Sequence, residues 1–416
     1  MNIKISIYKL VNLALRVGGM GMKFLLIIIL SKFFSVGDYR NFTLIITFIT
    51  LSIYVLGLDF YNFSIRDILN GEENLYTHKV VQTFFLYLSG YLIFGIIYYL
   101  FFNSLDFIKQ YALIVFLIAV TEHFAQELYR LLIAFGKVLL ANSMIFFRLF
   151  GWGIYVLFFL YTKKQISLNH ILIAWFTFNF ISILVILSFF AIKKYPQIIS
   201  VKIERYWIID GLKVSSIFFI GTVLLKIIEY ANRFVIDYFL DDIYVGIYGF
   251  YTTIALIVTI YINTIVISFE LPQLIKNKDI SAFPNFRKSI IKQLFIIVII
   301  LMIVIFPLIH WQGHEQYKEY FPIFILILAG IVFMNLSLVE HYLLYIEHKD
   351  KRILYIMVIT GAFSLFSAVL LTYLMGIYGT SISFLLTGML MFILRKHEVK
   401  KEIFYNKKNI VPQNKL

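Results

Sequence analysis

Twelve long apolar runs follow one another along this chain of 416 residues. Each run is close to the roughly 20 residues that an α-helix needs to cross about 30 Å of hydrocarbon. Transmembrane β-strands are about 10 residues long and alternate in polarity, so the runs predict helices. The runs are 10–31, 41–63, 80–102, 110–129, 140–161, 167–192, 214–239, 245–269, 293–311, 321–345, 353–375 and 377–394. We therefore predict an all-α, multi-pass membrane protein with about twelve transmembrane helices.

Composition excludes several other classes of protein. Hydrophobic residues make up 61% of the chain and charged residues only 14%, more apolar surface than a soluble protein of this length can bury. The chain has no Cys, so we expect neither disulfides nor a thiolate metal site. In a soluble protein a net charge of +14 would suggest binding to nucleic acid. In a membrane protein the Lys and Arg residues instead reflect its orientation in the bilayer, so we expect no nucleic-acid partner. The first run is too long for a cleaved signal peptide and carries two cations.

The positive residues predict the orientation. Most of the 37 Lys and Arg fall in alternate segments that begin with the N-terminus, and few fall in the segments between them. Because cytoplasmic loops are enriched in Lys and Arg, we expect both termini to be cytoplasmic. The basic tail at 395–416 would then contact anionic lipid. The longest outside loops, 32–40 and 312–320, have nine residues each and leave no domain for soluble chemistry, so we predict a transporter and not an enzyme.

Two turns in the sequence resemble each other. "FFSVGDYRNF" (33–42) joins the first two runs, and "FLDDIYVGIYGF" (239–250) joins the seventh and eighth. Matching "VGDY" to "VGIY" gives an offset of 209, whereas matching Phe33 to Phe239 gives 206. Six helices followed by six more indicate duplication, with bundles at 1–200 and 201–394 before the tail. Repeated helical lobes are a common plan for alternating-access transporters.

Charged residues within the runs cost about 2.5–3.5 kcal/mol each on insertion scales, so each needs a reason. Arg16 and Lys23 fall on one stripe of the first helix, which has no acidic residue of its own. Lys226 and Arg233 repeat the same spacing on the seventh helix, together with Glu229. Interhelical ion pairs and snorkelling side chains are one explanation. The other is a bound anion, and we predict that these four cations hold one.

The fourth helix carries a second polar face in "TEHFAQELYR" (121–130). From estimated helix ends, Glu127 and Arg148 of the next helix lie at the same depth, so we predict a structural ion pair between them. Glu122 and His123 lie near mid-bilayer and are candidates, with Glu229, for coupling transport to a proton or other ion gradient. His123 and Glu127 have no visible third ligand at zinc spacing, so we expect no metal and no other cofactor.

Over most of its length the sequence resembles the Wzx-type flippases of O-antigen and related lipid-linked oligosaccharides. These form part of the polysaccharide-transporter branch of the multidrug/oligosaccharidyl-lipid/polysaccharide exporter superfamily. The segments that carry the resemblance are "SVGDYRNFTLI", "GLDFYNFSIRDI", "EHFAQELYRLLIAFGK", "FRLFGWGIYV", "VGIYGFY" and "GIYGTSIS". The sequence departs from the family at Arg40, where such proteins usually carry Gly.

The resemblance implies a MATE-like fold of two pseudo-symmetric six-helix bundles around a cation-lined central cavity. It also implies movement of undecaprenyl-pyrophosphate-linked repeat units, such as those of lipopolysaccharide, across the bacterial cytoplasmic (inner) membrane. The partners would be this lipid-linked substrate, membrane lipids and polysaccharide assembly proteins.

Three other functions remain open from the sequence. An O-antigen polymerase or another integral-membrane enzyme of polysaccharide assembly has similar hydropathy, but such enzymes usually have a long outside loop. A multidrug exporter of the same superfamily would carry organic cations and should have an acidic cavity. A scaffold for polysaccharide assembly would not explain paired cations inside the membrane.

Overall fold

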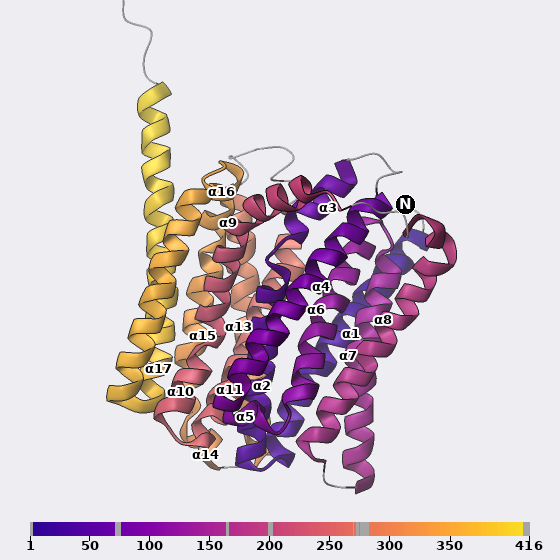
Figure 1. Cartoon of the computed structure of the whole chain (residues 1–416). Coiled ribbons are helices and arrows are strands. Elements are labelled where there is room, and N and C mark those ends of the chain that lie inside the picture. Colours follow the sequence, from indigo (N-terminus) through magenta and orange to yellow (C-terminus); the bar gives the residue numbers. More distant parts are fainter. Residues whose placement is uncertain are drawn as a thin grey trace, which may run out of the picture. The chain divides into compact units, whose positions relative to one another are not determined.

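The computed structural model describes residues 3–70, 76–163, 166–198, 203–268, 270–271, 274, 283–313 and 315–410. All regular elements within these residues are helices, as predicted. The chain forms two compact units, unit 1 from Met1 to Val223 and unit 2 from Leu224 to Leu416. Figure 1 labels the helices and colours them in chain order. The sequence places this boundary at residue 200, whereas the units divide inside a helix.

Unit 1 contains six long helices and several short ones. In chain order they are α1 (Ile3–Phe33), α2 (Val36–Gly57), α3 (Tyr61–Asn70), α4 (Tyr76–Phe101), η2 (Phe102–Ser104), α5 (Asp106–Lys109), α6 (Ala112–Ala134), α7 (Val138–Lys163), α8 (Leu168–Ile198) and the first part of α9 (Arg205–Tyr230).

Local sequence explains the two ends of α2. Ser35 precedes its first turn, and the Ser35 hydroxyl accepts a hydrogen bond from the backbone N–H of Asp38, which satisfies one of the N–H groups that a helix start leaves open. At its other end α2 stops at Gly57, and both Leu58 and Asp59 adopt positive φ values of 48° and 50°. Two consecutive non-glycine residues in this region make a strained break between α2 and α3.

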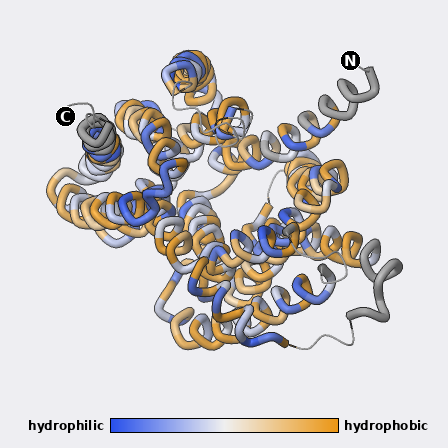
Figure 2. The backbone as a smooth tube through the Cα atoms, turned by 90° about the horizontal axis from the view of Figure 1, so that it is seen from above, coloured by the Kyte–Doolittle hydropathy of each residue, from blue (hydrophilic) through white to orange (hydrophobic). Residues whose placement is uncertain are grey.

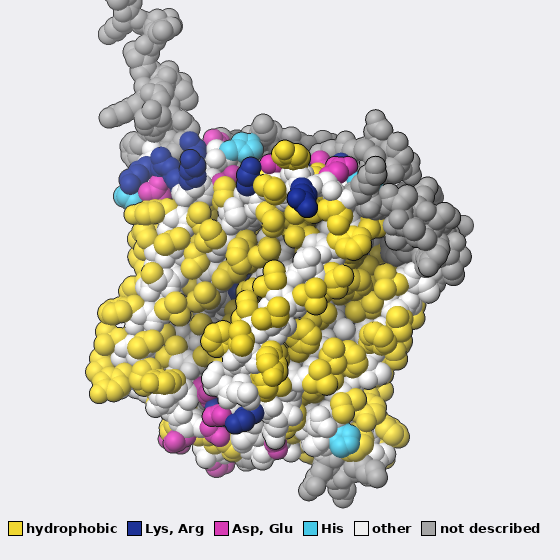
Figure 3. Space-filling model, in the orientation of Figure 1, with side chains coloured by type: hydrophobic (Ala, Val, Ile, Leu, Met, Phe, Trp, Pro, Cys, Tyr) yellow, Lys and Arg dark blue, Asp and Glu magenta, His cyan; other side chains and the backbone are white. Residues whose placement is uncertain are grey.

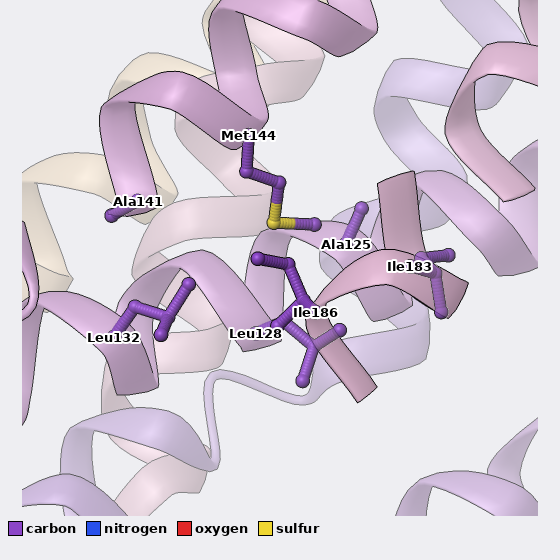
Figure 4. Close-up of a cluster of buried hydrophobic side chains, with 7 residues drawn as sticks. All are labelled: Ala125, Leu128, Leu132, Ala141, Met144, Ile183 and Ile186. Carbon is purple, nitrogen blue, oxygen red and sulfur yellow. The ribbon is translucent and has the colours of Figure 1, made fainter. Parts of the chain in front are cut away.

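The core of unit 1 lies between α6, α7 and α8. Leu128 and Leu132 of α6 pack with Met144 of α7 and Ile186 of α8 in a buried apolar cluster (Figure 4). Beside it, α1 approaches α7 closely, because a Cβ placed on Gly19 would lie 3.3 Å from Phe146 Cα. The small residues of α1 and α7 therefore allow the two backbones to pack side by side.

Helix α9 belongs to both units. Its beginning packs on unit 1, where the Trp207 ring lies 5.5 Å from the Phe60 ring and Trp207 Nε1 donates to Asp67 Oδ2 at 2.7 Å. Burial alone would raise the pKa of Asp67, but the hydrogen bonds from Lys79 and Trp207 hold it below its ordinary value. These contacts therefore stabilise the fold above the ordinary aspartate pKa, and that stabilisation is lost as pH falls through the lowered one. The end of α9 packs in unit 2, where Leu224 contacts Gly361.

Unit 2 continues from the end of α9 with a similar series. Its helices are α10 (Asn232–Phe239), α11 (Asp242–Ile262), the π-helical turn η3 (Asn263–Ile267), α13 (Phe283–Gln312), α14 (Glu315–Glu319), α15 (Phe321–Leu336), α16 (Leu338–Ile346) and α17 (Asp350–Ile410).

The last helix, α17, is two antiparallel helices. Gly376 interrupts it with φ 60° and ψ −144°. The Thr372 and Thr380 hydroxyls lie 2.6 Å apart, and so do those of Ser367 and Ser383, so the two halves run back along each other from Gly376. Eleven helices of the described residues are long and apolar enough to cross a membrane, and α17 counts as one of them. Its two halves bring the number of crossings to the predicted twelve.

The structure also decides the register of the repeat. Helix α1 ends at Phe33 and α2 begins at Val36, while α10 ends at Phe239 and α11 begins at Asp242. Both comparisons give an offset of 206. The "VGDY" and "VGIY" segments are therefore not equivalent, because the second lies almost one helical turn deeper in its helix.

The surface is that of a multi-pass membrane protein. Leu92, Ile96 and Leu100 form an exposed apolar stripe on α4, and Phe295 and Ile303 do the same on α13. Figure 2 colours the chain by residue hydropathy and shows that most residues along the long helices are apolar. On the face drawn in Figure 3, apolar side chains cover the middle and charged ones gather toward both ends. Such a band matches the hydrocarbon of a bilayer.

One close helix contact in unit 2 leads to a stability prediction. A Cβ on Gly388 of α17 would collide with the backbone of Gly330 in α15, which has no flexible atom to move aside. We expect Gly388→Ala to lower the free energy of unfolding by about 1–3 kcal/mol through overpacking. Thermal unfolding of the purified protein measures this.

Gly21 of α1 provides the matched control, because its Cβ would meet nothing within 4 Å. Gly21→Ala should leave stability unchanged or raise it by up to about 1 kcal/mol through helix propensity. Equal melting temperatures for both variants would show that the α15–α17 contact is looser than described.

Candidate functional site

A buried carboxylate connects four helices of unit 1. Arg148 Nη1 of α7 donates to Glu122 Oε2 of α6 at 2.7 Å. The other carboxylate oxygen accepts from Trp175 Nε1 at 2.5 Å and from Asn179 Nδ2 at 3.0 Å, both on α8. Lys23 of α1 interacts electrostatically with the same carboxylate. We call these five residues the Glu122 cluster, and the three hydrogen bonds fix this carboxylate in place.

The predicted ion pair between Glu127 and Arg148 is wrong, because both side chains have other partners. Arg148 pairs with Glu122, and Glu127 pairs with Arg130 one turn further along α6. By the actual helix ends, Arg148 lies ten residues after Val138, while Glu122 and Glu127 lie twelve and seven residues before Ala134. Depth therefore does not distinguish the two acids. The rotation of α6 about its axis determines which acid pairs with Arg148, because it turns Glu122 toward α7.

Glu127 is the centre of a second polar cluster on another face of α6. It accepts a hydrogen bond from Tyr87 of α4 at 2.8 Å and also contacts Arg130. The Arg130 guanidinium lies 3.5 Å from the ring centroid of Tyr61 in α3, in cation–π geometry. Glu127 is only 3% exposed, and Arg130 and Tyr87 are the groups that contact its buried carboxyl oxygens.

His123 belongs to this second cluster and is fully buried. Its Nδ1 is 2.7 Å from the Tyr91 hydroxyl, and its Nε2 is 3.8 Å from Glu127 Oε1. Nε2 has no hydrogen-bond partner within the described residues. It faces the end of α2, because a Cβ on Gly57 would lie 2.7 Å from it. His123 therefore touches the strained break between α2 and α3.

Arg16 lies on α1 near the Glu122 cluster. Asn142 Nδ2 of α7 donates to Asn12 Oδ1 at 2.8 Å, and Gly19 packs on Phe146, so Arg16 is level with the turn of α7 before Arg148. The Arg16 side chain is half-buried. Its Nε atom is buried without a hydrogen-bond partner within the described residues.

In unit 2 the two cations lie on consecutive helices, Lys226 near the end of α9 and Arg233 at the start of α10. Lys226 Nζ donates to Glu229 Oε2 at 2.7 Å, while Arg233 Nη2 donates to Thr252 Oγ1 of α11 at 3.0 Å. Both cations lie near the ring of Tyr230, at 5.8 and 5.4 Å from its centroid. The sequence leaves ion pairing and anion binding open for this segment, and Lys226 pairs with an acid.

The two basic pairs are also not equivalent positions of the repeat. At an offset of 206, Lys23 corresponds to Glu229, and Lys226 lies four residues beyond the counterpart of Arg16. Four residues are about 6 Å along a helix and nearly one turn. The pairs therefore occupy similar faces at different depths.

Sequence reasoning missed a third polar cluster, in unit 2. Arg395 is 5% exposed and donates to Ser337 Oγ at 2.7 Å, beside buried His341. Glu340 is 2% exposed and pairs with Arg287 of α13. The apolar runs of the sequence place Arg395 at the start of the basic tail and outside the spans. Val399 could have indicated that Arg395 is buried, because this apolar residue lies one turn after Arg395 and continues the buried face of the helix.

Six-helix units joined through α9 define a MATE-like membrane fold, and solved structures identify it further. A multidrug resistance MATE family transporter of the MOP superfamily, in an inward-facing conformation, aligns with a TM-score of 0.73 at 14% identity, covering 98% of this chain and 96% of that one. The lipid II flippase MurJ, in an inward closed conformation, aligns with a TM-score of 0.68 at 16% identity over 95% of this chain and 87% of that one.

A mutant of the Vibrio cholerae MATE transporter VcmN also aligns, with a TM-score of 0.59 at 13% identity over 94% of this chain and 96% of that one. No family model and no curated protein matches the sequence. Likeness at these identities shows the fold alone, and it confirms the predicted fold class. The resemblance to Wzx-type flippases is supported at the level of this fold.

Proposed function

We propose that this chain is a Wzx-type flippase, which moves an undecaprenyl-pyrophosphate-linked oligosaccharide across the bacterial cytoplasmic membrane by alternating access. The observation that carries the proposal is the charge balance inside unit 1. Glu122 and Glu127, the two carboxylates of α6, each contact an arginine of α6 or α7. Helix α1 adds Arg16 and Lys23 and no acid, so positive charges outnumber negative ones among these residues, which favours an anionic substrate.

Both units would take part in binding the anion. Arg16 and Lys23 would bind the pyrophosphate from unit 1, and Arg233 and Lys226 would bind it from unit 2. Arginine donors in a membrane interior form strong charge-assisted contacts with phosphoryl oxygens. Both termini would be cytoplasmic, and the lipid chain of the substrate would remain in the bilayer during transfer.

Two other functions would make different use of these residues. The fold is shared with a multidrug resistance transporter, which makes export of organic cations the second candidate. A cationic substrate would be repelled by Arg16, Lys23 and Arg148, which outnumber the single acid of the Glu122 cluster. An O-antigen polymerase would need reacting groups in a long external segment, and the described outer helix α14 has only five residues.

Transport by the purified protein tests the proposal. The full chain is reconstituted into vesicles with a fluorescent undecaprenyl-diphosphate-linked saccharide, and the fraction accessible to a membrane-impermeant quencher is followed with time. We expect protein-dependent transfer of this lipid and no accumulation of a cationic dye. Dye transport without lipid transfer would favour the exporter, and elongation of the saccharide would favour the polymerase.

The three candidates for ion coupling differ in their contacts. Three donors hold Glu122, and Lys226 holds Glu229. His123 Nε2, in contrast, makes no hydrogen bond within the described residues, although Glu127 Oε1 is 3.8 Å away, and it lies against the end of α2. We therefore assign proton uptake to His123. His123→Gln should abolish the dependence of lipid transfer on a pH gradient, because glutamine cannot take up a proton.

Glu122→Gln is the matched control for this prediction and should keep the gradient dependence. Both measurements use the vesicle assay with and without an imposed pH gradient. Loss of the dependence in Glu122→Gln, with His123→Gln unaffected, would move the coupling role to Glu122.

A further inference from the structure

Three tyrosine rings meet at one end of unit 2. The ring centroids of Tyr244 and Tyr320 lie 5.4 Å apart at an interplanar angle of 90°, and their hydroxyl oxygens lie 3.3 Å apart. The Tyr378 ring centroid lies 5.9 Å from that of Tyr320. All three residues are half-buried, so part of each remains accessible. We call these three residues the tyrosine cluster.

Each ring of the cluster is positioned by a different turn of the chain. Tyr244 lies in the first turn of α11, Tyr320 joins α14 to α15, and Tyr378 closely follows the reversal within α17. The short helix α14 is itself anchored, because Tyr317 is 5% exposed and its ring lies 5.0 Å from that of Phe250 in α11. The cluster is therefore held in place before any ligand binds, which lowers the cost of binding one.

Tyrosines at this end of unit 2 could simply belong to the aromatic belt at a membrane interface. Tyr238 and Tyr373 fit that explanation, since they lie near the ends of their helices and are 82% and 73% exposed. The tyrosine cluster differs from them, because its rings face one another from three elements and two of its hydroxyls are within hydrogen-bond distance. Contact with lipid does not require this arrangement.

The described charged side chains of these turns are mostly acidic. Asp241 precedes α11, Asp242 is its first residue, and both are exposed. Glu319 is also exposed and lies within electrostatic reach of the tyrosine cluster. Lys318 pairs with an acid of its own helix. A phosphate would be repelled at this place, whereas carboxylates accept strong hydrogen bonds from neutral hydroxyl groups.

The cluster lies on the same face of α11 as the arginine contact of unit 2. Tyr244, Tyr248 and Thr252 follow one another at intervals of four residues, which places them on one face of the helix. Thr252 Oγ1 accepts a hydrogen bond from Arg233. Tyr244 lies about 12 Å from Thr252 along the helix axis. A substrate whose diphosphate is bound at Arg233 would therefore extend its saccharide toward the tyrosine cluster.

We infer that the tyrosine cluster is a saccharide-binding platform, which contacts the oligosaccharide of the lipid-linked substrate at the end of unit 2 predicted to lie outside. This inference rests on the proposed function and adds the residues that contact the sugars. A pyranose ring has a face of C–H groups that packs on an aromatic ring, and a rim of hydroxyls that phenol and carboxylate groups bind. Tyrosine side chains supply such contact area at a small cost in conformational entropy.

Binding to the full chain in lipid nanodiscs tests the platform. The probes are undecaprenyl diphosphate and the same lipid carrying a tetramer of N-acetylglucosamine, and the dissociation constant of each is measured. This tetramer is suitable because stacking uses the C–H face that pyranose rings share. The ratio of the two constants isolates the contribution of the saccharide. We expect the glycosylated lipid to bind about tenfold more tightly than the bare lipid.

Tyr320→Ala removes the ring that contacts both others. It should lower this ratio about three- to tenfold and leave binding of the bare lipid unchanged. Tyr378→Ala removes one outer ring and should have a smaller effect in the same direction. Tyr373→Ala is the matched control, because Tyr373 is an exposed tyrosine of the same helix, α17, and the ratio should equal that of the parent.

The outcomes separate this inference from the proposed function. A parent ratio of one, or an unchanged ratio in Tyr378→Ala, would overturn the platform even though the bare lipid binds. An equal loss in Tyr373→Ala would assign the effect to the aromatic belt and would also overturn it. Tyr378→Ala alone decides the question if Tyr320→Ala fails to fold. Absence of binding of either lipid to the parent would overturn the proposed function itself.

Discussion

Arg16→Ala and Arg233→Ala should each abolish export of surface polysaccharide in a flippase-deficient strain while the protein stays in the membrane. Each change removes a charge-assisted contact to the diphosphate, worth roughly 1.5–3 kcal/mol, which weakens binding about ten- to a hundredfold. Lysine at either position should retain part of the activity, because the charge survives and the bidentate geometry does not. Surface polysaccharide and membrane protein level are measured on the same cells.

Lys213→Ala is the matched control for this experiment. Lys213 is also a cation of a long helix, but its side chain is 73% exposed and pairs with Asp210 on the same helix. We expect normal export, since an exposed pair contributes little. Full export by both arginine variants would exclude them from substrate binding. Loss of the Arg233→Ala protein from the membrane would instead point to its bonds with Thr252 and Thr253 as structural.

The number and order of the helices could be predicted because they depend on local chemistry. Each span needs its own apolar run, and the turn at Gly376 could be placed between two runs from sequence alone. The register of the repeat could not be settled in this way. It depends on where α1 and α10 end, and the better identity match, at 209, was not the structural one at 206.

The polar clusters could be predicted only in part. Periodicity correctly placed Glu122, His123 and Glu127 on helix α6, but it could not show that Trp175 and Asn179 of α8 complete the environment of Glu122. Partners on other helices depend on how each helix is rotated about its axis. A single sequence reports depth through residue counting and leaves that rotation undetermined, so it gave the wrong acid to Arg148.

Glu127→Ala should strongly destabilise unit 1. It leaves Arg130, whose side chain is 19% exposed, beside Tyr61 without its carboxylate, and it removes the acceptor of the Tyr87 hydroxyl. Breaking a buried ion pair from one side costs about 3–5 kcal/mol. We expect less protein in the membrane and a lower melting temperature after purification.

Removing both partners of this pair tests whether the loss comes from the unpaired charge of Arg130 or from a role of Arg130 in stacking on Tyr61. Glu127→Ala combined with Arg130→Met leaves no buried charge behind, so it should recover part of the stability lost in the single variant. Glu315→Ala is the control for removal of a paired acid, since Glu315 is 83% exposed in its contact with Lys318, and it should have almost no effect.

If the double variant is less stable than Glu127→Ala, then Arg130 stabilises the fold through its stacking on Tyr61 and not through the charge of Glu127. If Glu127→Ala is as stable as the parent, the buried charge of Arg130 must be met by another group, and Asp59, which lies within electrostatic reach of Glu127 and Tyr61, is the acid placed to do so.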